Sequence, residues 1–305
     1  MVTVAVEPPT RPAMHAAFAA AVREAGATVG PLCDAEALIW ADPQRSNLYP
    51  ELIATAPHVR WIQLPYAGIE PFVDYLDARY EWTCGKGVYA PPVAEHALAL
   101  ALAGLRGIAT YARADRWSAP MGRNLLGARV LILGGGGICA SLIDLLAPFD
   151  CAITVFRHRD APIERARVIT ERTQLDAALP QADIVVIALA LTDRTRGIVD
   201  SAFLSRMADH AWLVNVGRGG HVVTDDLVAA LVERRIGGAA LDVTDPEPLP
   251  QGHRLWSLPN CIVTPHIANT PEMGLPLIAG RVRENTARFV AGEPLIGVVD
   301  VSLGY

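Results

Sequence analysis

Hydrophobic and polar positions along the chain form two kinds of pattern, short apolar runs and helical spacings, which alternate and indicate alternating strands and helices. Short apolar runs bounded by polar residues predict strands, and longer stretches with apolar residues three and four apart predict amphipathic helices. In the first part of the chain we expect strands over 2–6, 37–40 and 59–64, and helices over 11–27 and 47–57. This alternation predicts a small parallel sheet with covering helices.

A second series of elements follows an apolar helical stretch over 93–117, which predicts one long helix or two. Six further strands are then predicted from the runs ARVLIL, AITVF, ADIVVIAL, AWLVNV, GGAAL and CIVTP. Helical patterns lie between several of these runs, and a last helix is expected over 275–291. Six strands of this kind suit a dinucleotide-binding sheet, so the pattern favours the α/β class.

Composition excludes several classes of protein. The 305 residues are enough for two domains, and 51% hydrophobic residues exclude general disorder. The net charge of −6, without a block of like charges, argues against a nucleic-acid partner. The start MVTVAVEPPT lacks the features of a signal peptide.

The apolar stretch after residue 92 is interrupted by Glu95, His96 and Arg106, so we expect no membrane span. The five cysteines are scattered, without a CxxC pair. This pattern favours reduced thiols in a cytoplasmic protein and predicts no metal site.

A glycine turn between a predicted strand and a predicted helix is typical of a dinucleotide site. Gly134 suits the tight turn, Gly136 allows close approach of a pyrophosphate, and Gly137 and Ile138 offer N–H donors at the start of the helix. Cys139 replaces the third glycine of the pattern. Its thiol is either activated by the helix N-terminus, with a lowered pKa, or buried and inert.

Three other strand ends carry reactive side chains. Arg218 follows the run AWLVNV, Glu247 lies beyond GGAAL, and His266 follows CIVTP. The carboxyl ends of parallel strands form the ligand edge of an open sheet. A guanidinium that grips an oxo acid, an imidazole that moves a proton and a carboxylate that orients the imidazole together predict a reducing site.

These stretches resemble the D-2-hydroxyacid dehydrogenase family, with glyoxylate and hydroxypyruvate reductases as the more similar members. The resemblance runs from WIQLPYAGIE to the C-terminus and is densest from QADIVVIALALTDRTRGIVD to TPHIANT, with the closing VVDVSLGY in addition. It implies two α/β domains: a Rossmann-type doubly wound parallel sheet and a smaller flavodoxin-like substrate domain. We expect the substrate domain over 1–96, completed by 274–305, and the dinucleotide-binding domain over 97–273.

The resemblance also implies roles for individual residues. Arg218, Glu247 and His266 would be catalytic, and the substrate would contact Arg218, His266 and the turn formed by Tyr66, Ala67 and Gly68. The cofactor would contact the glycine turn and, beyond it, Arg157, His158, Arg159, Leu189, Thr195, Val216, Gly217, Asp242 and Ala268.

Cofactor choice follows from the turn after AITVF. NAD-preferring relatives have an acidic residue near the position of Arg157, whereas here Arg157 and Arg159 are available for a 2′-phosphate. We therefore expect NADP, with NAD as the alternative.

The resulting hypothesis is a cytoplasmic homodimer that reduces a small 2-oxo acid to the D-2-hydroxy acid with NADPH. Two alternatives stay open at this point. One is a phosphoglycerate-type dehydrogenase, and the other is a binding protein that senses dinucleotides and acts as a corepressor.

Overall fold

The computed structural model describes residues 1–301, and two compact units account for them. One unit consists of Met1–Tyr89 together with the segment from Thr270 onward, and the other consists of Ala90–Asn269. The expected domain boundary at 96/97 lies inside a helix of the second unit. Part of the closing VVDVSLGY motif lies outside the described residues.

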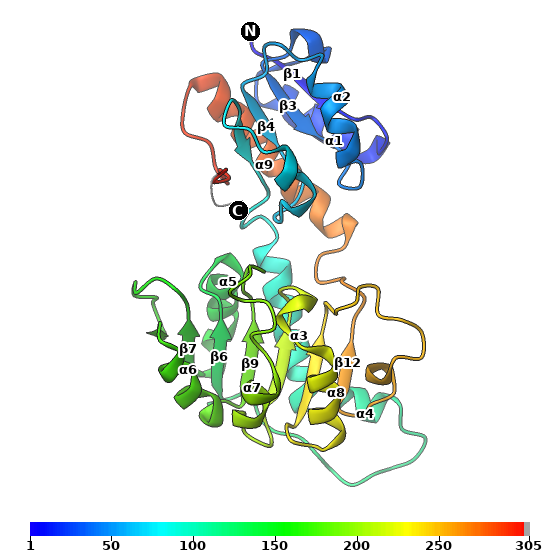
Figure 1. The fold of residues 1–305 in the computed structure, drawn as a ribbon, viewed down its shortest axis with the longest axis vertical. Helices are drawn as coiled ribbons and strands as arrows, with labels where there is room; N and C mark the ends of the chain where they lie inside the picture. The colour runs from blue at the N-terminus through cyan, green and yellow to red at the C-terminus, as the bar shows by residue number, and fades with distance from the viewer. Residues whose placement is uncertain (302–305) are drawn as a thin grey trace. The chain divides into compact units, whose positions relative to one another are not determined.

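The first unit is built on a five-stranded parallel sheet of order β2-β1-β3-β4-β5. Its strands are β1 (Thr3–Glu7), β2 (Thr28–Val29), β3 (Ala37–Trp40), β4 (Trp61–Gln63) and β5 (Glu81–Thr83). Its helices are α1 (Pro12–Glu24), α2 (Tyr49–Ile53) and α9 (Pro271–Ala291), of which α1 and α9 pack together (Figure 1).

Alternation along the strands divides the core of this unit between two faces. Val4, Val6 and Ile39 pack with α1 and α9, whereas Ala5, Leu38 and Trp40 face an aromatic cluster on the other side. In this cluster, the ring centroids of neighbouring side chains lie 5.4–6.2 Å apart. Its members are Trp40, Tyr49, Phe72, Tyr75 and Trp82. Both faces of the sheet are therefore covered, as a parallel sheet requires.

The second unit holds a seven-stranded parallel sheet of order β12-β11-β10-β9-β6-β7-β8. Its strands are β6 (Arg129–Leu133), β7 (Ala152–Phe156), β8 (Ala166–Ile169), β9 (Ile184–Ile187), β10 (Trp212–Asn215), β11 (Gly238–Leu241) and β12 (Cys261–Val263). Its helices are α3 (Ala90–Leu105), α4 (Ile108–Ala112), α5 (Gly137–Leu146), α6 (Arg172–Ala178), α7 (Ser201–Arg206) and α8 (Thr224–Val232).

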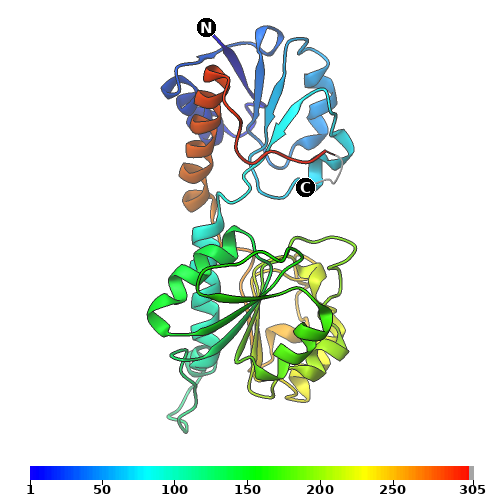
Figure 2. The ribbon, with the colours of Figure 1, turned by 90° about the vertical axis from the view of Figure 1, so that its left-hand side faces the viewer.

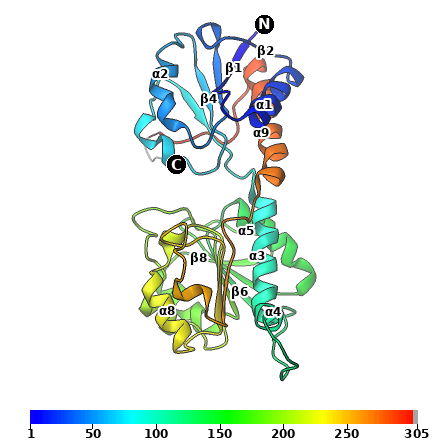
Figure 3. The same cartoon turned by 90° about the vertical axis from the view of Figure 1, so that its right-hand side faces the viewer.

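Helices cover both faces of this sheet (Figures 2 and 3). Val130, Ile132 and Val186 pack with α3 and α5 on one face. Leu131, Leu133 and the other alternate positions pack with α6, α7 and α8 on the opposite face. The result is a Rossmann-type doubly wound sheet in which sequence order reverses between β6 and β9.

Helix ends explain where several predictions shift. The stretch over 93–117 forms two helices because Gly107 takes a left-handed φ of 62° between α3 and α4. The last helix begins earlier than expected, since Thr270 caps it and Pro271 occupies its first position. No helix among the described residues has both the length and the apolarity needed to cross a membrane.

Candidate active site

The carboxyl edge of the seven-stranded sheet brings the predicted residues together in a definite order. Gly134 follows β6 and Arg157 follows β7, while Leu189 lies beyond β9, in the middle of the sheet. Arg218 and His266 lie beyond β10 and β12, which flank β11. The glycine turn and Arg157 therefore lie on one half of the edge, and Arg218 and His266 lie on the other.

His266 and Glu247 form a direct pair at this edge. The Nδ1 atom of His266 lies 2.6 Å from Oε1 of Glu247. The two side chains are 51% and 43% exposed, so both stay open to a ligand. Within the part of the chain that the structure describes, the other carboxylate oxygen of Glu247 has one long contact, 3.5 Å from the backbone nitrogen of Thr244. The ring is thus held through one nitrogen, and its Nε2 is available for proton transfer.

The backbone of His266 has an unusual conformation, with a φ of 54°. Left-handed backbone at a residue other than glycine costs roughly 1–3 kcal/mol and is common at functional sites. Two hydrogen bonds hold it, from the N–H of His266 to the carbonyls of Asp242 at 2.8 Å and Thr264 at 3.0 Å. The turn after β12 is therefore tied to the end of β11.

Asp242 anchors the same turn with its side chain. It accepts hydrogen bonds from Thr264 Oγ1 at 2.6 Å, from the N–H of Ile267 at 2.9 Å and from the N–H of Ala268 at 3.0 Å. Burial raises the pKa of Asp242, but these donors and His96 outweigh it and hold the pKa at about 2. The carboxylate is ionised at neutral pH and organises the loop that presents His266.

His96 belongs to the same support. Its Nε2 lies 3.0 Å from Thr264 Oγ1 and 3.3 Å from Asp242 Oδ1. The ring therefore contacts the groups that hold the turn before His266. His253 lies outside this group and caps a short helical turn by accepting from the N–H of Leu255.

Arg218 is fixed through its main chain. Its carbonyl accepts from Nδ2 of Asn215 at 3.0 Å, and its N–H donates to Nδ1 of His221 at 3.1 Å. Its guanidinium donates to the carbonyl of Gly217 at 2.9 Å. Gly219 is required here because a Cβ at this position would collide with the carbonyl of Thr244. The loop therefore holds Arg218 at the end of β10 with little freedom.

The glycine turn after β6 has the shape that a pyrophosphate needs. Gly134 has a φ of 112°, and a Cβ there would collide with the carbonyl of Ala188. Gly136 precedes α5, and a Cβ on it would meet nothing within 4 Å. Gly137 is exposed, and Ile138 follows it in the first turn of α5, where N–H groups have no intrahelical acceptor. Open space, free donors and the helix dipole together fit a bound phosphate group.

Arg157 lies beside this turn. Its side chain packs over Gly135, where a Cβ would come within 2.8 Å of the arginine Cδ. Arg157 itself is half-buried, whereas His158 and Arg159 are exposed on the turn that follows β7. A guanidinium therefore stands at the position expected for the group that recognises the 2′ substituent of the ribose.

The structure decides between the two alternatives for the Cys139 thiol, activated or buried and inert. The thiol is buried in the first turn of α5, and burial raises its pKa to about 11 against the opposing charge of Arg157. The idea of an activated thiol with a lowered pKa is therefore wrong. Burial outweighs the helix N-terminus because the side chain points into the core beneath α3 and α5 rather than toward the glycine turn.

The remaining cofactor candidates shape the loops at this edge. Thr195 closes the turn after β9, because its hydroxyl donates to the carbonyl of Ala190 at 2.8 Å and accepts from the N–H of Thr192 at 2.8 Å. Leu189 packs against the core, Val216 is buried, and the N–H of Gly217 donates to Oδ1 of Asn215. These residues shape the loops after β9 and β10 through their backbone conformation more than through free polar groups.

The turn predicted to contact the substrate carboxylate, residues 66–68, lies in the first unit. Tyr66, Ala67 and Gly68 follow β4, and the carbonyl of Tyr66 accepts from the N–H of Gly85 at 2.6 Å. Burial, with Glu70 and Asp42, raises the pKa of Tyr66, so its hydroxyl stays protonated. No hydrogen bond among the described residues engages the N–H groups of Ala67 and Gly68. Such paired donors suit an anion.

A hollow of about 490 Å³ lies elsewhere on the second unit, between α6 and the strands β6, β7 and β8. Its floor contains Leu131, Thr154 and Ile169, and Arg129 stands at the amino-terminal end of β6. The glycine turn, Arg218 and His266 do not line it. The chemistry therefore identifies the carboxyl edge of the sheet, and not this hollow, as the candidate site.

One residue of the edge escaped the sequence analysis. His221 is completely buried and contacts the main chain of Arg218. The signal available in the sequence was a histidine three residues after Arg218, in a stretch that is otherwise glycine and valine.

Comparisons with known proteins agree with this geometry. Residues 97–268 match the family model described as D-isomer specific 2-hydroxyacid dehydrogenase, NAD binding domain. An uncharacterized protein of Corynebacterium melassecola is 38% identical over 84% of this chain and 87% of its own length. Glyoxylate/hydroxypyruvate reductase A of Serratia proteamaculans is 29% identical over 88% of this chain and 87% of its own length.

Solved structures agree over the whole chain. A D-isomer specific 2-hydroxyacid dehydrogenase from Xanthobacter autotrophicus, in complex with NADPH and MES, is 27% identical with a TM-score of 0.84, covering 100% of this chain and 99% of the other. An NADPH-dependent glyoxylate/hydroxypyruvate reductase from Sinorhizobium meliloti, in complex with NADP and sulfate, is 26% identical with a TM-score of 0.83, covering 100% of both. This chain therefore belongs to the D-isomer specific 2-hydroxyacid dehydrogenase family and is an NAD(P)-dependent oxidoreductase.

Proposed function

We propose that this oxidoreductase reduces a small, unphosphorylated 2-oxo acid of the glyoxylate or hydroxypyruvate type, with NADPH as the reductant. The observation that carries the proposal is the contact of 2.6 Å between His266 and Glu247 at the same sheet edge as Arg218. This edge combines an anion-binding cation with an oriented proton donor, which are the two functions that carbonyl reduction requires of the protein.

Each of these residues has a distinct part in the reaction. The guanidinium of Arg218 binds the carboxylate and the carbonyl oxygen of the oxo acid in one plane and polarises the carbonyl. The nicotinamide, when bound, supplies the hydride. His266 gives its Nε2 proton to the oxygen that becomes the alkoxide, and it takes that proton back in the oxidation direction. Glu247 orients the ring and stabilises the imidazolium.

NADPH is proposed as the cofactor because Arg157 stands beside the glycine turn at the end of β7. A guanidinium there attracts a 2′-phosphate, whereas an acidic residue would repel it. The relatives from Xanthobacter autotrophicus and Sinorhizobium meliloti, which contain NADPH or NADP, support this assignment. The exposed Arg159 adds a second positive charge on the same turn.

The size of the substrate is proposed from the number of anchors. Arg218, the cation assigned to the substrate in the second unit, suits one carboxylate and the carbonyl beside it. The names of the relatives from Serratia proteamaculans and Sinorhizobium meliloti support glyoxylate and hydroxypyruvate as the substrate class. The first unit is then the substrate domain, and the second is the dinucleotide-binding domain.

The test is a panel of 2-oxo acids assayed by NADPH absorbance. We expect glyoxylate and hydroxypyruvate to give the highest kcat/KM, with phosphohydroxypyruvate clearly lower. A preference for the phosphorylated compound would favour the phosphoglycerate-type alternative. Tight NADPH binding without turnover of any 2-oxo acid would favour the dinucleotide-sensing alternative.

A further inference from the structure

We propose that His221 is a positioning residue for Arg218, and that it works only as a neutral imidazole whose Nδ1 accepts the hydrogen bond of the Arg218 main-chain N–H. This inference rests on the proposed function, in which Arg218 binds the oxo acid.

The first observation is burial together with contact. His221 is 0% exposed, and its Nδ1 lies 3.1 Å from the nitrogen and 2.9 Å from the carbonyl oxygen of Arg218. The ring also fills the space in front of Gly217, where a Cβ would come within 3.2 Å of the histidine Cε1. One buried side chain therefore contacts the main chain of Arg218 and also packs against Gly217, the residue before it.

The protonation state follows from the partners of the Arg218 carbonyl. A carbonyl oxygen has two lone pairs. Here it already accepts from Nδ2 of Asn215 at 3.0 Å and from the N–H of His221 at 3.3 Å. A proton on Nδ1 would make a third donor to that oxygen and would face the N–H of Arg218. Without that proton, Nδ1 accepts the N–H of Arg218.

The surroundings of the ring favour the same state. Burial lowers the pKa of His221, and the nearby guanidinium groups of Arg218 and Arg196 lower it further. The carbonyls of Ala190 and Arg218 act in the opposite direction but are outweighed. Nε2 is buried and has no hydrogen-bond partner within the described residues. An uncharged ring whose Nδ1 accepts the N–H of Arg218 carries its one proton on Nε2.

Protonation of His221 therefore has a predictable consequence. Nδ1 becomes a donor, the N–H of Arg218 loses its acceptor, and a positive charge appears next to two arginines. Arg218 then leaves the position in which it binds the oxo acid, so kcat/KM falls on the acid side.

The experiment compares His221→Asn with His221→Leu. Asparagine places an oxygen acceptor where Nδ1 stands but does not titrate, whereas leucine fills the space without an acceptor. We expect His221→Leu to lose about tenfold or more in kcat/KM for the oxo acid, the cost of one unsatisfied buried N–H group. We expect His221→Asn to stay within about threefold of wild type and to lose the acid-side fall in kcat/KM.

Two controls keep the interpretation clear. The melting temperature and the Kd for NADPH identify a variant that has merely unfolded or lost the cofactor. In protein with ¹⁵N-labelled histidine, the ring signal that His221→Asn removes reports which nitrogen carries the proton, whether or not the enzyme turns over.

The outcomes separate the two proposals. Wild-type protein that reduces no 2-oxo acid contradicts the proposed function, while the ring signal still tests His221. Two outcomes contradict the part given to His221: an Nδ1 that carries the proton at neutral pH, or an active wild type in which leucine and asparagine variants behave alike.

Discussion

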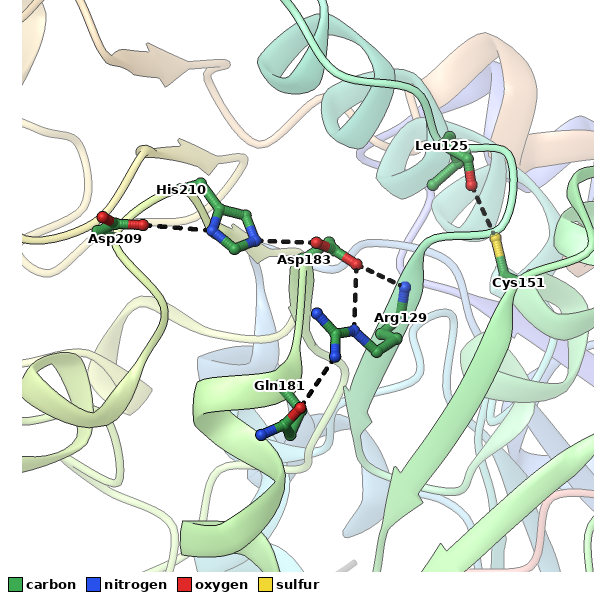
Figure 4. A network of polar contacts seen from close by, with 7 residues as sticks. All are labelled: Leu125, Arg129, Cys151, Gln181, Asp183, Asp209 and His210. Atoms are coloured by element: carbon green, nitrogen blue, oxygen red, sulfur yellow. Dashed lines mark hydrogen bonds and ion pairs between the residues drawn. The ribbon is translucent and has the colours of Figure 1, made fainter.

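Two imidazole–carboxylate pairs lie at opposite ends of the seven-stranded sheet, and they differ in how completely their carboxylates are satisfied. At the amino-terminal end, His210 Nε2 lies 2.9 Å from Asp183, which also accepts from the N–H of Arg129 at 2.8 Å and pairs with its guanidinium (Figure 4). At the carboxyl end, Glu247 has His266 and one long contact with the N–H of Thr244.

Exposure follows the same division. The side chains of His210 and Asp183 are 27% and 17% exposed, against 51% and 43% for His266 and Glu247. Asp183 precedes β9 and contacts residues at the start of β6 and before β10. Its carboxylate therefore links these three strands and serves the fold (Figure 4). A histidine beside a carboxylate thus indicates a working acid only where the pair keeps an open side and lies at the ligand edge of the sheet.

The largest expected effect separates the two histidines. His266→Ala should lose about 100-fold or more in kcat, the range for a positioned general acid, with little change in melting temperature. His210→Ala should leave kcat unchanged and lower the melting temperature, by roughly 2–4 °C for each kcal/mol lost. Steady-state kinetics and thermal unfolding of both variants measure this. Normal turnover by the His266 variant would remove that residue from the mechanism.

A smaller effect concerns cofactor choice at the same carboxyl edge. Wild-type protein should prefer NADPH over NADH by about tenfold or more in kcat/KM, since one charge-assisted hydrogen bond contributes roughly 1.5–3 kcal/mol. Arg157→Asp should reverse the preference, mainly through KM, because it replaces an attraction with a repulsion.

Arg167→Asp is the matched control for that substitution. Arg167 is an exposed arginine on the neighbouring strand β8, and the change in charge is the same. It should leave the cofactor preference as it is. An equal shift in both variants would mean that overall charge, and not Arg157, sets the preference.

The smallest effect tests the amino-terminal pair by pH. Burial raises the pKa of Asp183, but the N–H of Arg129, His210 and the charge of Arg129 outweigh it, so the folded pKa lies below the ordinary 3.8. A lowered folded pKa gives stability that is present above the unfolded value and is lost as the pH falls through the folded one.

Asp183→Asn should therefore lower the melting temperature by a few degrees at pH 7 and have less effect near pH 3. Thermal unfolding across this range measures the difference. A constant gap between variant and wild type at every pH would show that the hydrogen bonds matter and the charge does not.

Sequence patterns predicted the central strands well because those strands are buried on both faces. The run IVVI in β9 is apolar throughout, and WLVN in β10 is apolar up to its last residue, as expected of buried parallel strands. The strands that escaped prediction are β2, β5 and β8, which lie at sheet edges. In β8, the exposed Arg167 interrupts the apolar pattern, and β2 has only two residues.

The candidate site shows a similar limit. Strand ends are visible in the sequence, so Arg218 and His266 were predictable as residues of one edge. The contacts that support them were not, because they join distant segments. His96 meets Thr264 across 168 positions of sequence, and a buried histidine such as His221 carries no pattern that separates it from any other polar residue in a turn.

The order of groups along the carboxyl edge has a consequence for how such a protein changes over generations. The turn after β7 is separated from the ends of β10, β11 and β12 by β6 and β9, and each turn is an independent connection between rigid elements. Substitutions that retune the preference for one nucleotide therefore need not disturb proton transfer. A lineage, or an engineer, can exchange the reductant without redesigning the reaction.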